Sequence, residues 1–86
     1  HPRYAEIVGE LLRIDMELHW QRGGRALVDG YRRRFADVLA DPRRLAGLAF
    51  EEYRARCQAG EAATPAEYRD RYGIDTADWP PPTAAR

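Results

Sequence analysis

Apolar residues recur every three or four positions along most of this sequence, and a few glycine and proline residues interrupt the pattern. The recurrence places the apolar side chains before Gly23 on one face of a helix, which we expect to face the core; they are Tyr4, Ile7, Leu11, Ile14 and Leu18. The pattern therefore predicts an all-α fold.

Helix start and stop signals divide this pattern. Gly23-Gly24 ends the first predicted helix, and a second helical run follows over residues 27–39. Asp41-Pro42 is typical of a helix start, because aspartate is a favourable N-cap and proline is tolerated at the first helical position. Gly60 then ends the third predicted helix.

The fourth predicted helix has the clearest start signal in the chain. Thr64-Pro65-Ala66-Glu67 combines a threonine N-cap, a proline at the first helical position and a glutamate three residues after the threonine, which is a capping box. Gly73 ends this short helix. We therefore expect a compact bundle of about four helices over residues 1–73, followed by a Pro/Ala-rich tail or linker over residues 74–86.

The composition indicates where such a domain occurs. The chain has 86 residues, which is enough for one small domain. All 14 basic residues are arginine and alanine is abundant, as in proteins of GC-rich bacterial genomes. The sequence opens at His1-Pro2 without a methionine and ends in a Pro-rich segment that is typical of a semi-rigid linker. We expect a module of a larger bacterial protein.

Several function classes have little support in the sequence. A chain of this size buries only about 60% of its unfolded surface, so a deep catalytic cleft is not expected. Gly23-Gly24 lacks the Gly-Lys-Ser/Thr ending of a phosphate-binding loop. Cys57, the only cysteine, cannot form an internal disulfide, and with two distant histidines it offers too few zinc ligands. No apolar run reaches the roughly 20 residues of a membrane span. We expect a cytoplasmic, non-enzymatic domain without cofactor, metal or membrane span.

Three charged residues fall on predicted core faces. Asp15 lies among the apolar residues of the first helix, and Glu52 and Arg56 lie four positions apart on the apolar face of the third. A buried charge is costly unless it is paired, and a guanidinium can bind carboxylates bidentately. We therefore predict a structural polar clamp in which Arg56 meets Asp15 across the helix interface while Glu52 braces the guanidinium. A partner or ligand site built on the same charges is the alternative.

A Tyr-Arg-x-Arg frame occurs three times, each with an apolar group four residues after the tyrosine. The frames start at Tyr31, Tyr53 and Tyr68, and their unequal spacing does not indicate a solenoid repeat. On a helix, residues four apart are neighbours, so three aromatic pairs at the edge of the core are expected. The alternative is three arginine-bearing edges of one recognition surface.

One basic run stands out in this neutral chain, which has 14 basic and 14 acidic residues. Arg32, Arg33 and Arg34 are consecutive, and Arg43-Arg44 follows nearby. Because acidic residues flank the run, a solvated, salt-bridged face is favoured over a nucleic-acid site. Arginine and tyrosine are common anchors of protein interfaces, so the candidate interaction surface consists of these three arginines and Tyr31.

The order of several motifs resembles a known kind of segment. Residues 14–20 (IDMELHW) resemble the (I/V)-D-L-E-Y-R-W opening of small helical segments that lie N-terminal to many planctomycete-type serine/threonine protein kinases. Residues 31–35 are similar to the Tyr-x-x-x-Phe-Pro stretch of these segments, with Ala36 in place of the proline. Residues 51–72 are similar to their E-E-Y-R-x-R … A-G-E … P-x-x-E-Y-x-x-R-F-P part, with Tyr72-Gly73 in place of Phe-Pro.

The resemblance implies an adaptor or regulatory module beside a kinase catalytic domain, and it carries over no catalytic residue. The sequence itself lacks a glycine-rich nucleotide loop, a His-Arg-Asp motif and an Asp-Phe-Gly motif. We therefore expect a helical protein-interaction or regulatory module whose partner is another protein or the neighbouring domain of the same chain. Two alternatives stay open: a small arginine-dependent nucleic-acid-binding domain, and an oligomerising adaptor similar to the death-fold class.

Overall fold

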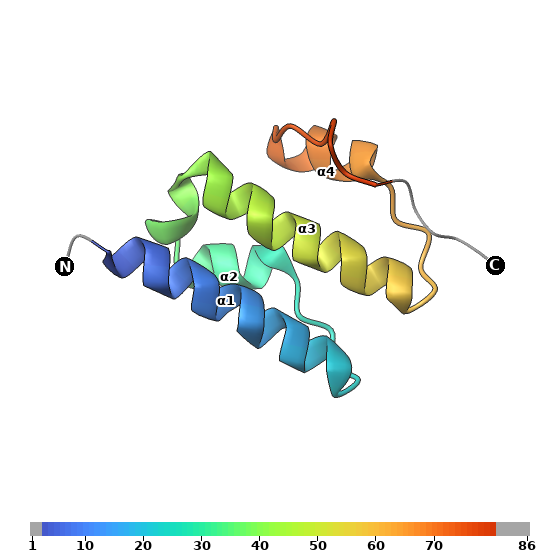
Figure 1. Ribbon diagram of the computed structural model, residues 1–86, viewed down its shortest axis with the longest axis horizontal. Coiled ribbons are helices and arrows are strands. Elements are labelled where there is room, and N and C mark those ends of the chain that lie inside the picture. The colour runs from blue at the N-terminus through green and yellow to red at the C-terminus, as the bar shows by residue number, and fades with distance from the viewer. Residues whose placement is uncertain (1–2, 81–86) are drawn as a thin grey trace.

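The computed structural model describes residues 3–80, and within that range it contains helices and no strand (Figure 1). The all-α prediction with four helices is confirmed. None of the helices in this range is both long and apolar enough to cross a membrane. The elements in chain order are α1 (Tyr4–Gln21), α2 (Val28–Arg34), the short 3-10 helix η1 (Val38–Ala40), α3 (Pro42–Gln58) and α4 (Pro65–Tyr72).

The start and stop signals act as the sequence predicts. The side chain of Asp41 accepts a hydrogen bond from the backbone N–H of Arg43 at 2.8 Å. Thr64 Oγ1 accepts one from the backbone N–H of Glu67 at 3.3 Å. Gly73 follows α4 with φ of +68°, a left-handed conformation that costs glycine little.

The second helical run is shorter than its apolar pattern predicts. The α helix stops at Arg34, and after a turn the chain continues as η1. Val38 and Leu39 of η1 are almost completely buried. The break redirects these two side chains into the core, so tertiary packing outweighs the local helical pattern here.

The four helices are two copies of one unit, which the unequal spacing of the three Tyr-Arg-x-Arg frames had concealed. Each unit has a long helix, a glycine with φ of +83° or +87°, and a short helix. Moving 37 positions along the chain leads from Tyr31 to Tyr68 and from Asp15 to Glu52. In both units the tyrosine hydroxyl donates a hydrogen bond to that acidic residue 16 positions earlier. The interpretation that the frames are no repeat is therefore corrected for those of α2 and α4.

The two units stack in the same orientation, so α1 and α3 run parallel (Figure 1). Gly9 of α1 lies against Arg44 of α3, and further along Arg13 lies against Gly47. A methyl group added to Gly9 would come within 3.3 Å of the Arg44 side chain, so this glycine leaves room for that side chain. The α1 residues and the α3 residues in this contact are at non-equivalent positions of the two units, as in a repeat array.

The α1 face that packs against α3 is not the one that the sequence predicts. Leu12 and Met16 are buried there, whereas Leu11 is 57% exposed. The buried face of α1 also contains Gly9, which lies against the Arg44 side chain of α3. The expected core residues are all exposed: Tyr4, Ile7, Leu11, Ile14 and Leu18.

The domain continues beyond the expected boundary at residue 73. Ile74 and Thr76 are buried, and the Trp79 ring lies 5.2–5.5 Å from three aromatic rings of α3 and α4. The Tyr53 hydroxyl donates a hydrogen bond to the Pro80 carbonyl at 2.7 Å. Residues 74–80 are therefore a packed segment of the domain, and the rest of the predicted tail, 81–86, lies outside the described residues.

Candidate functional site

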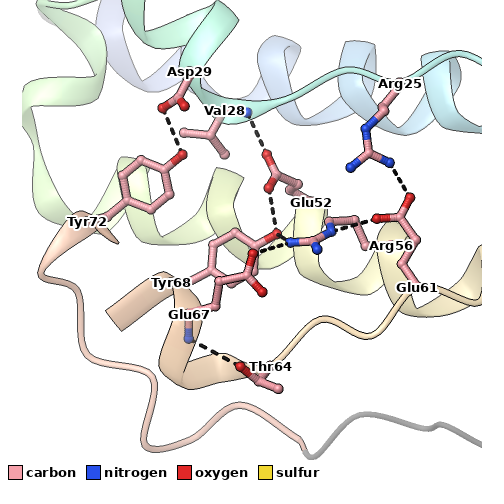
Figure 2. A network of polar contacts seen from close by, with 10 residues as sticks. All are labelled: Arg25, Val28, Asp29, Glu52, Arg56, Glu61, Thr64, Glu67, Tyr68 and Tyr72. Atoms are coloured by element: carbon pink, nitrogen blue, oxygen red, sulfur yellow. Dashed lines mark hydrogen bonds and ion pairs between the residues drawn. The ribbon is translucent and has the colours of Figure 1, made fainter. Parts of the chain in front are cut away.

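A buried carboxyl group joins the two units (Figure 2). Glu52 of α3 is only 2% exposed. Its Oε1 accepts a hydrogen bond from the backbone N–H of Val28, the first residue of α2, at 2.7 Å. Its Oε2 accepts one from the Tyr68 hydroxyl of α4 at 2.5 Å. Both oxygens are thus satisfied, and the start of α2 is fixed to the second unit.

Arg56 extends this network toward the loop before α4. Its guanidinium donates to the Tyr68 hydroxyl at 2.9 Å and to Glu67 at 2.7 Å. It also donates to Glu61 at 2.9 Å, and Glu61 in turn pairs with Arg25 of the first unit. The segment before α2 is therefore held to the second unit by an ion pair as well as by the Glu52 contact.

The electrostatics of this network suit a structural contact. Burial, together with the hydrogen bond to Glu52, raises the pKa of Tyr68. Burial alone would lower the pKa of Arg56, but its hydrogen bonds to Glu67, Tyr68 and Glu61 outweigh that effect and raise it. Hydrogen bonds from Arg25 and Arg56 lower the pKa of Glu61. These three pKa shifts move Tyr68, Arg56 and Glu61 further from titration at neutral pH, so Tyr68 stays neutral while Arg56 and Glu61 stay charged.

The predicted clamp is only partly assembled. Glu52 and Arg56 share one network, but the link between them runs through the Tyr68 hydroxyl. Asp15 is not part of it: its side chain is 51% exposed and accepts from the Tyr31 hydroxyl at 2.6 Å. The contact of Arg56 with Asp15 is therefore corrected, because α1 turns a different face to α3.

Sequence reasoning missed three partners of the clamp, Glu61, Glu67 and Tyr68. A signal for Tyr68 existed, since Tyr68 follows Glu52 at the same distance of 16 residues at which Tyr31 follows Asp15. Glu67 was recognised only as part of the capping box. Its side chain instead reaches Arg56, while its backbone N–H serves the cap.

The candidate interaction surface on α2 is smaller than predicted. Tyr31 is only 5% exposed and its hydroxyl is bound to Asp15, so it belongs to the core. The guanidinium of Arg32 lies 5.5 Å from the centre of the Tyr72 ring, within cation–π distance. Arg33 and Arg34 line a groove between α1 and α2. All three arginines are exposed, so they remain as the accessible part of the predicted surface without Tyr31.

The groove between α1 and α2 matches a filled groove in the second unit. Its lining includes Asp15, His19, Gly30, Tyr31, Arg33 and Arg34. At the corresponding place between α3 and α4, the second unit holds residues 25–32 of the first unit, through Glu61, Glu52 and Tyr72 (Figure 2). The first unit thus has the same kind of groove without an occupant among residues 3–80.

The outer face of α1 carries an exposed apolar row. We call this the α1 row, and each of its members is between 41% and 57% exposed. The members follow one another at alternating intervals of three and four residues, the spacing at which one helix packs along another. They are Tyr4, Ile7, Leu11, Ile14 and Leu18.

Trp20, His19 and Cys57 have structural surroundings. Trp20 donates its indole N–H to the Ala26 carbonyl at 2.8 Å, which closes the loop after α1. His19 Nδ1 lies 2.9 Å from the Asp15 carbonyl, and Cys57 is half-buried. Within residues 3–80, no three His, Cys, Asp or Glu side chains are grouped so that they could hold a metal ion.

No known protein family, curated protein or solved structure matches this chain. The similarity to segments that precede bacterial kinases accordingly stays a prediction from the motifs. Function must be inferred from the geometry of the α1 row, the groove beside it and the arginines of α2.

Proposed function

We propose that this domain is a non-catalytic protein-interaction module that docks on a partner through the α1 row. The carrying observation is that five apolar side chains lie exposed on one helix face, outside the core of the domain. Small proteins rarely expose contiguous apolar surface unless it binds something. Arg33 and Arg34, at the neighbouring groove, supply charged contacts at the rim of this surface.

The kinase resemblance supports a role of this module in bacterial signalling. A helical segment beside a catalytic domain can regulate it by docking on it or by recruiting another protein. The partner is then the neighbouring domain of the same chain or a separate protein. The network around Glu52 and Arg56 holds the two units in one orientation, so the docking face is presented as a rigid surface.

A double substitution in the α1 row tests this function. Leu11→Glu with Ile14→Glu should leave the melting temperature within a few degrees of wild type, because both side chains lie outside the core. The same change should abolish capture of partner proteins by the tagged domain from a bacterial lysate, as judged by mass spectrometry. Arg33→Glu should weaken that capture without unfolding the domain.

The matched control is Leu12→Glu, one position along the same helix. Leu12 is buried, so this change should unfold the domain. An unchanged set of captured proteins with the folded double variant would refute the α1 row as the binding surface.

A further inference from the structure

The contact between α1 and α3 indicates what kind of element covers the α1 row. The α3 positions that correspond to Ile7, Leu11 and Ile14 are Arg44, Leu48 and Glu51. Arg44 and Glu51 lie at the α1–α3 interface, where Arg44 adjoins Gly9 and Glu51 pairs with Arg13 at 3.8 Å. Leu48, between them along α3, is 1% exposed. The α1 row is therefore the same face of the unit that, on α3, receives a parallel helix.

The acidic residue beside the covered α3 face is buried, and the acidic residue beside the uncovered α1 row is exposed. Glu52 is buried because the preceding unit lies over it and Val28 donates a backbone N–H to it. Asp15, its counterpart, is half exposed although it accepts a hydrogen bond from its own tyrosine in the same way. A carboxyl group can accept several hydrogen bonds, so Asp15 can still receive a backbone N–H from a partner.

We propose that the α1 row binds a partner helix that runs parallel to α1, and that the short segment after this helix enters the groove between α1 and α2. This inference rests on the proposed interaction function and adds the partner's geometry to it. The partner repeats the contact of α1 and residues 25–32 with the second unit, so the same interface is used twice along one stack.

The chemistry of the face specifies the partner helix. Ile14 is the counterpart of Glu51, which pairs with Arg13 of α1. The partner helix therefore carries an apolar residue at the position where α1 carries Arg13. Arg33 and Arg34 line the groove that the short segment would enter, so that segment carries an acidic residue to pair with them. An amphipathic helix followed by an acidic short segment meets both requirements.

A second copy of this chain fits the face poorly. α1 packs on α3 with one of its faces, and the equivalent face of α3 carries Phe50 and Tyr53. The Trp79 ring covers this α3 face, at centroid distances of 5.3 Å from Phe50 and 5.2 Å from Tyr53. Pro65 is the second-unit counterpart of Val28, whose backbone N–H binds Glu52. In a stack of two copies, Pro65 would face Asp15 of the next copy, and proline has no N–H to donate to it. Head-to-tail growth into filaments is thereby blocked, and the α1 row is left for a different helix.

A three-unit chain tests the proposal directly. Residues 1–40 are joined to residues 4–86, which keeps the 37-residue period, and Arg13→Leu is introduced into the added unit to match Ile14. Hydrogen–deuterium exchange is then compared with the natural 86-residue chain. We expect exchange of the amides in the original α1 to slow at least tenfold, and the added unit to be protected from exchange.

The matched control places Leu11→Glu and Ile14→Glu in the original α1 of the three-unit chain, and we expect exchange there to return to the natural rate. An added unit that exchanges like an unfolded chain overturns the proposal. A natural chain that sediments as a dimer, with Leu11→Glu restoring the monomer, also overturns it in favour of a second copy. If the added unit fails to dock while the α1 row is still required for partner capture, the interaction function stands and only the parallel-helix geometry falls.

Discussion

Replacing Glu52 with alanine is expected to lower the free energy of unfolding by about 3–5 kcal/mol, the cost of breaking a buried polar pair. The substitution leaves the backbone N–H of Val28 and the hydroxyl of Tyr68 without their acceptor. Each buried donor left unsatisfied costs about 1–3 kcal/mol. The change also removes one of the links between the two units, because Val28 belongs to the first and Tyr68 to the second. Urea unfolding followed by circular dichroism measures the loss.

The repeat supplies an internal control for this prediction. Asp15 holds the corresponding position in the first unit and accepts the corresponding tyrosine hydroxyl, but its side chain is half exposed. Asp15→Ala should therefore cost only about 1 kcal/mol, the net value of one hydrogen bond. Equal losses for the two alanine variants would show that Glu52 does not join the units.

Replacing Trp79 with alanine is expected to cost about 3 kcal/mol, at the lower end for loss of a packed tryptophan because the ring is only partly buried. Its ring contacts Phe50, Tyr53 and Tyr68 at centroid distances of 5.2–5.5 Å. For a domain of this size, the melting temperature should fall by about 15 °C. The variant also uncovers the α3 face that a next unit would use, so a concentration-dependent increase in mass should accompany the loss of stability.

Asp78→Ala is the matched control, because Asp78 is exposed and directly precedes the tryptophan. It should leave the melting temperature within about 2 °C of wild type, as is usual for surface substitutions. If Trp79→Ala has the same melting temperature as this control, then residues 74–80 are a linker, as the sequence alone suggests, and not a packed segment of the domain.

The starts of α3 and α4 and the end of α4 could be predicted from the sequence because the signals are local. An N-cap such as Asp41 or Thr64 acts on a backbone N–H two or three residues away. A glycine such as Gly73 acts through its own φ angle. These effects need no knowledge of how the helices pack.

The choice of the buried face of α1 could not be predicted in the same way. The α1 row and the face with Leu12 and Met16 are both apolar at helical spacing. What decides between them is the tertiary contact with α3, which periodicity along one helix does not contain. That choice also moved Asp15 to the surface and so removed one member of the predicted clamp.

The repeat was hidden because its two copies differ at the surface. Their similarity is limited to a few positions, such as Asp15 and Glu52, Tyr31 and Tyr68, or Gly23 and Gly60. The third Tyr-Arg-x-Arg frame, which begins at Tyr53 on a long helix, broke the regular spacing. Comparing the hydrogen bonds of both tyrosines shows the repeat at once.

The most direct test of the account is the solvent exposure of the α1 row in solution. Methyl NMR signals of the isolated domain, recorded at low concentration with a soluble paramagnetic probe, report this exposure residue by residue. We expect the probe to broaden the signals of Leu11 and Ile14 while those of Leu12, Met16 and Leu48 stay sharp. Signals of Leu11 and Ile14 as sharp as that of Leu48 would mean that this face is buried within the domain, and would contradict both the docking surface and the unit arrangement on which it depends.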